Sequence, residues 1–110
     1  LLFESRFPFI DTNNGGSVKG YIDNTRALIG MLNDQTKVIP GHGQLTDKAG
    51  VQRSLDMMQA TLAIVQGYKA AGLTEQQTVN KGLGEQWKSW HWSFITEERW
   101  IKTLYHADVN

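Results

Sequence analysis

Apolar positions recur every three or four residues along most of the chain, which is the spacing of helices with one buried face. The first such stretch begins after Ser17, whose hydroxyl is suited to accept a free amide of the first turn. Asn33 and Asp34 are expected to end it. Its recurring positions are Val18, Tyr21, Ile22, Thr25, Leu28, Ile29 and Leu32. The pattern predicts an amphipathic helix.

A second and longer helical pattern follows Thr46 and Asp47, either of which can cap it, and extends to about Ala71. Gly72 is suited to terminate it. The positions expected to face inward are Val51, Leu55, Met58, Leu62 and Val65.

Two short helices are predicted near the C-terminus. Thr74 opens the first, and Gln77 stands three residues later in the spacing of a capping box. Leu83 and Gly84 are expected to close it. The second starts at Thr96 and carries Trp100, Ile101, Leu104 and Tyr105 on one side.

Strands are expected at two places outside these helices. Leu1 to Phe3 is a short apolar run, and Thr36 to Ile39 contains a β-branched pair. Pro40 and Gly41 stop the second run, because proline donates no hydrogen bond to a ladder. Glu4 to Gly16 has the composition of a loop, although it contains Phe7, Phe9 and Ile10. Packing of these three side chains into the core is favoured over their lining a substrate cleft.

Aromatic side chains are concentrated just before the last helix, at Trp87, Trp90, Trp92 and Phe94. Such a cluster can stack on bases or sugars. The favoured interpretation is that the rings hold the short C-terminal helices on the rest of the fold, because the charge balance offers no phosphate-binding background.

Composition narrows the classes of function. Eleven basic and eleven acidic residues give no net charge, so the chain has neither a nucleic-acid footprint nor a basic face for a membrane. No apolar run approaches the roughly 20 residues that span a bilayer. Without cysteine, any metal must be held by His, Asp or Glu, and the compartment is not indicated.

His42 is the candidate metal ligand. It lies between two glycines, where a predicted strand ends and a helix is about to begin, and ligand sites gather beyond the carboxyl ends of strands. Zinc requires three or four protein ligands, and neither His91 nor His106 has the spacing to join His42. Those two histidines are expected to be structural. No catalytic residue is assigned.

The sequence Val38-Ile39-Pro40-Gly41-His42-Gly43, followed by Thr46-Asp47 and a long helix, resembles the C-terminal portion of metallo-β-lactamase-fold hydrolases. In that family the matching histidine is a ligand of the second zinc ion. The run from Leu1 through Arg6-Phe7-Pro8-Phe9 is similar to the segment that follows the family's metal-bridging aspartate. The HxHxDH ligand motif of the family's N-terminal half is not in this chain.

The resemblance implies an α/β (α+β) fold, namely the C-terminal half of an αββα metallo-β-lactamase fold, with short strands and about four helices. Residues 1–72 would form this half, and 73–110 a helical, Trp-rich extension packed on it. The parent protein would be a zinc-dependent hydrolase with one or two Zn²⁺ ions. A metal-bound hydroxide would attack a small ester, thioester, lactam, sulfate or phosphate-type substrate.

The chain alone is expected to be inactive and to require the missing N-terminal half as a partner. An exposed strand edge would then favour homo-oligomers. The alternative is a non-catalytic, mostly helical interaction module that uses the aromatic cluster from Trp87 to Phe94. The substrate, the metal and the compartment are left open.

Overall fold

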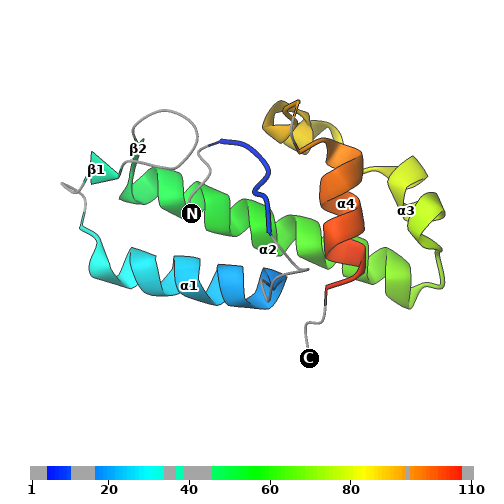
Figure 1. Cartoon of the computed structure of the whole chain (residues 1–110), viewed down its shortest axis with the longest axis horizontal. Helices are drawn as coiled ribbons and strands as arrows, with labels where there is room; N and C mark the ends of the chain where they lie inside the picture. The colour runs from blue at the N-terminus through cyan, green and yellow to red at the C-terminus, as the bar shows by residue number, and fades with distance from the viewer. Residues whose placement is uncertain (1–4, 11–16, 34–36, 39–45, 94, 108–110) are drawn as a thin grey trace.

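The computed structural model describes residues 5–10, 17–33, 37–38, 46–93 and 95–107. In these residues the order of elements is α1 (Val18–Met31), β1 (Lys37–Val38), β2 (Thr46–Asp47), α2 (Lys48–Ala70), α3 (Glu75–Lys81), the 3₁₀ helix η2 (Glu85–Trp90) and α4 (Glu97–Tyr105). Figure 1 shows α1 and α2 lying side by side and antiparallel, while α4 crosses α2 and α3 lies near the C-terminal end of α2.

Each of the first three α-helices begins at a residue whose side chain accepts a hydrogen bond from a backbone amide of the first turn. Ser17 caps α1 by accepting from the amide of Gly20, and Asp47 caps α2 by accepting from the amide of Gly50. Thr74 and Gln77 form the expected capping box at the start of α3. These contacts satisfy amides that have no partner within their own helices.

Helix ends are also close to their expected positions. Helix α2 stops at Ala70, two residues before Gly72, which has a φ of +94°. Helix α3 ends at Lys81, slightly earlier than expected, because Gly82 takes a φ of +73°. Such a backbone suits glycine and closes a helix.

The core lies where α2 meets α1 on one side and α4 on the other. Four of the five inward positions expected for α2 are buried, and Leu62 is half-buried. The fully buried side chains of α4 pack against the buried positions of α2. Together the two helices bury Trp100, Ile101, Leu104, Met57, Met58 and Val65 away from water.

The N-terminal segment joins the same core, as expected for its apolar residues. Phe7 is fully buried and stacks on Trp100, with ring centroids 5.9 Å apart. Ile10 is buried as well, whereas Phe9 is 36% exposed under the guanidinium of Arg99.

The expected α/β fold class is wrong: the described residues are mostly helical and do not form half of an αββα metallo-β-lactamase fold. Their strands are β1 and β2, two residues each, which pair antiparallel with Val38 opposite Thr46. The apolar run beginning at Lys37 indicated a buried sheet strand, but its observed partner is local and the core is built from helix faces. Leu1 to Phe3, Thr36 and Ile39 lie outside the described residues.

Candidate functional site

Residues 39–45, called the His42 segment, connect β1 to β2 in the chain, and these two strands are hydrogen-bonded to each other. Val38 of β1 is the partner of Thr46 in β2, and Lys37 is the partner of Asp47. Asp47 then accepts the amide of Gly50 at 3.0 Å and starts α2. His42 itself lies outside the described residues. The structure therefore fixes the two ends of the segment at the N-terminus of α2.

Strand β2 is packed closely against the first turn of α2. A Cβ placed on Gly50 would stand 1.7 Å from Oγ1 of Thr46. Only glycine allows this approach without movement of the Thr46 side chain, because real Cβ atoms do not come so near another atom. The close contact between Gly50 and Thr46 therefore helps to hold the C-terminal end of the His42 segment against α2.

The other two histidines make structural contacts, in keeping with the expectation for them. Nδ1 of His91 accepts the amide of Glu97 at 3.1 Å, at the start of α4. Nε2 of His106 pairs with Oε2 of Glu75, which links the end of α4 to α3. Within the described ranges, no group of three or more metal-binding side chains comes together.

The indole rings serve packing, as the favoured interpretation has it. Trp87, Trp90 and Trp92 are half-buried and lie against the core. The indole nitrogen of Trp92 donates to the carbonyl of Phe7 at 2.8 Å, and Arg6 lies over its ring. Phe94 is outside the described residues. The cluster joins the N-terminal segment to the C-terminal helices.

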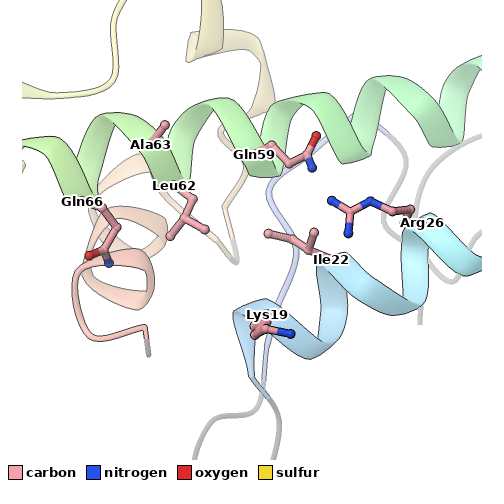
Figure 2. Close-up of a pocket in the computed structure, with 7 residues that line it drawn as sticks. All are labelled: Lys19, Ile22, Arg26, Gln59, Leu62, Ala63 and Gln66. Carbon is pink, nitrogen blue, oxygen red and sulfur yellow. The ribbon is translucent and has the colours of Figure 1, made fainter. Parts of the chain in front are cut away.

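An open groove that was not predicted from the sequence runs between α1 and α2. Figure 2 shows it between the two helices, with Ile22 of α1 opposite Leu62 of α2. Its volume is about 350 Å³. The described residues that line it are Lys19, Ile22, Arg26, Gln59, Leu62, Ala63 and Gln66. The signal available in the sequence was their shared helical spacing, at three and four residues on each helix.

Charges on one side of the groove come from α1. Oδ2 of Asp23 lies 2.7 Å from the Lys19 ammonium, and Oδ1 lies 3.3 Å from the Arg26 guanidinium. The hydrogen bond from Lys19, more than the charges around it, lowers the pKa of Asp23. Two cations and one carboxylate leave a single positive charge on this rim.

No family model, curated protein or solved structure matches the chain. None of the helices in the described ranges combines the length and the apolar character needed to cross a bilayer.

Proposed function

We propose that this chain is part of a zinc-dependent hydrolase related to the metallo-β-lactamase superfamily, and that His42 is one of the metal ligands. The observation that carries the proposal is the pairing of Val38 with Thr46 at the start of α2. A two-residue strand stands before the His42 segment, and the Asp47 cap and the long helix α2 follow it, which is part of the order in the motif. The pairing of that strand with Thr46 is not something that the motif predicts. The proposal rests on this segment alone, because the described residues do not form the sheet of the αββα fold.

The roles of Asp47 and of the other two histidines support the choice of His42. Asp47 is used as a helix cap, and His91 and His106 are each paired with groups of α3 or α4. His42 is the remaining histidine of the chain. Since zinc needs at least three protein ligands, the others must come from further parts of the parent protein.

The chemistry proposed for the parent is hydrolysis of a small electrophilic substrate. Zinc, when bound, lowers the pKa of a water molecule so that it is nucleophilic near neutral pH. The part assigned to this chain is to hold one imidazole in place through β1, β2 and the cap of α2. A segment tied at both ends loses less conformational entropy when its side chain binds a metal.

The alternative function, an interaction module using the aromatic cluster, has weaker support. Its Trp87, Trp90 and Trp92 rings pack against the core. A platform for a partner would instead present the ring faces to solvent.

The test is His42→Ala in the longest protein encoded by the open reading frame. Bound zinc, measured by elemental analysis, and hydrolysis of a panel of ester, thioester and lactam substrates should fall together. His91→Ala and His106→Ala are matched controls, because each removes an imidazole that is used elsewhere. Unchanged zinc content in the His42 variant would remove His42 from the site.

A further inference from the structure

The groove between α1 and α2 has the size and lining of a small-ligand site. Its volume of about 350 Å³ lies at the lower end of the range for ligand pockets, roughly 300 to 1,000 Å³. Ile22 and Leu62 form apolar walls from opposite helices, as Figure 2 shows, and Ala63 is also among the residues that line the groove. An aliphatic chain would bury apolar surface against these walls.

The charge of the groove favours an anion. Lys19 and Arg26 are the charged residues among its described lining, and no carboxylate is among them. The adjacent Asp23 contacts Arg26 at only one guanidinium nitrogen, at 3.3 Å. A guanidinium has five N–H donors, so most of its donors are not used in this contact.

The carboxamide of Gln59 in α2 extends the polar end of the groove. Figure 2 shows the Arg26 guanidinium reaching from α1 toward the carboxamide of Gln59. Gln66, at the other end, donates from Nε2 to the carbonyl of Leu104 at 2.9 Å. Arg26 and Gln59 thus form one polar end beside the apolar walls.

We propose that this groove binds an aliphatic monocarboxylate of medium chain length from solution, with its carboxylate on Arg26 and its chain between Ile22 and Leu62. One guanidinium beside an apolar surface fits a single carboxylate, which it can bind through two parallel hydrogen bonds. A ligand with several negative charges would be repelled by Asp23. The proposal is independent of the hydrolase activity, because it is argued only from described residues of α1 and α2.

The probe is octanoate, titrated into the full chain and followed by the amide resonances of α1 and α2. Saturable shifts should appear at groove residues. Arg26→Gln should weaken binding about tenfold, since hydrogen bonds to a charged group are among the stronger ones. Asp23→Asn should strengthen it by removing the competing carboxylate. Ala63→Leu should block it, because Ala63 is exposed and a larger side chain there fills the groove without entering the core.

A control variant and a control ligand test whether octanoate binds in this groove through its carboxylate. Arg53→Gln changes an exposed arginine of α2 that does not line the groove, and it should leave octanoate binding unaltered. Octanol should bind more weakly than octanoate. Equal binding of octanol, an unaffected Arg26→Gln variant, or binding to anionic vesicles without binding of monomeric octanoate would each overturn the proposal.

Discussion

Trp100 donates a hydrogen bond from its indole nitrogen to Oγ1 of Thr61 at 3.1 Å, and both residues are fully buried. The Thr61 hydroxyl in turn donates to the carbonyl of Met57 at 2.7 Å. The polar atoms at the contact between α2 and α4 are therefore paired with each other, which makes burial of the large indole favourable.

Thr61→Val should destabilise the fold by about 1 to 3 kcal/mol, because the indole N–H of Trp100 would stay buried without an acceptor. Denaturant unfolding followed by tryptophan fluorescence measures this loss. Thr103→Val is the control: its hydroxyl donates to the carbonyl of Arg99 in an exposed position. That variant should change stability by less than about 0.5 kcal/mol. Equal losses in the two variants would contradict the role given to Thr61.

Two glycines of α2 should respond in opposite ways to alanine. Gly50→Ala places a Cβ 1.7 Å from the Thr46 hydroxyl and should cost about 1 to 3 kcal/mol as the Thr46 side chain is displaced. Gly67→Ala meets no atom within 4 Å and should stabilise the helix by about 0.5 to 1 kcal/mol. Thermal unfolding of both variants checks the signs, and a stabilised Gly50→Ala would show that β2 does not pack on α2.

Removal of the α2 cap should weaken the helix at the end of the His42 segment. Asp47→Ala leaves the amide of Gly50 without its side-chain acceptor and should cost about 1 kcal/mol. Asp47→Asn keeps an oxygen acceptor at the same position and should retain most of the stability. Hydrogen exchange at the first turn of α2 reports the effect directly. Similar protection in the alanine and asparagine variants would rule out the cap.

Stability should decline at alkaline pH through Tyr21. Burial raises the pKa of Tyr21 from 10.0 to about 12. The folded state therefore holds the phenol proton more tightly than the unfolded chain does. The stabilisation is fully present below pH 10 and is lost as the pH rises from 10 to about 12.

The size of this alkaline effect is on the order of 2 kcal/mol for a shift of this magnitude. Tyr21→Phe should remove that part of the pH dependence, as measured by denaturant unfolding across the alkaline range. Spectrophotometric titration of the wild-type chain should show one late-ionising phenol that is absent from the titration of Tyr21→Phe. Identical stability profiles for the two proteins would contradict the assignment.

Helix boundaries were predictable because their chemistry is local. The caps at Ser17, Asp47, Thr74 and Thr96 each lie within three residues of the amide that they accept. The 3₁₀ helix η2 was missed, since its first residue follows Gly84 at a φ of +108° and its few residues leave no clear period.

The strand prediction failed because strand pairing depends on a partner that a run of apolar residues does not identify. Val38 has high β-propensity wherever its partner lies, and the partner observed is Thr46, eight positions later. The groove was missed for a related reason. The spacing of Lys19, Ile22 and Arg26 places them together on α1, but their meeting with α2 depends on how the helices pack.

Of the candidate site, the sequence predicted only the motif that contains His42. The residues around His42 indicated a metal ligand, and the described structure adds the anchoring of both ends of the segment at β1 and β2. Metal binding at His42 stays a prediction, because the residue lies outside the described ranges.

The position of Phe7 has a consequence for synthesis on the ribosome. Its carbonyl accepts from the Trp92 indole, 85 positions later, and its ring stacks on Trp100. Both partners emerge from the ribosome after α1, α2 and α3, and domains fold as units once their parts are available. Phe7 can therefore make neither contact until Trp92 and Trp100 have left the ribosome, so its place in the core is filled only after α2 and α3 have been synthesised.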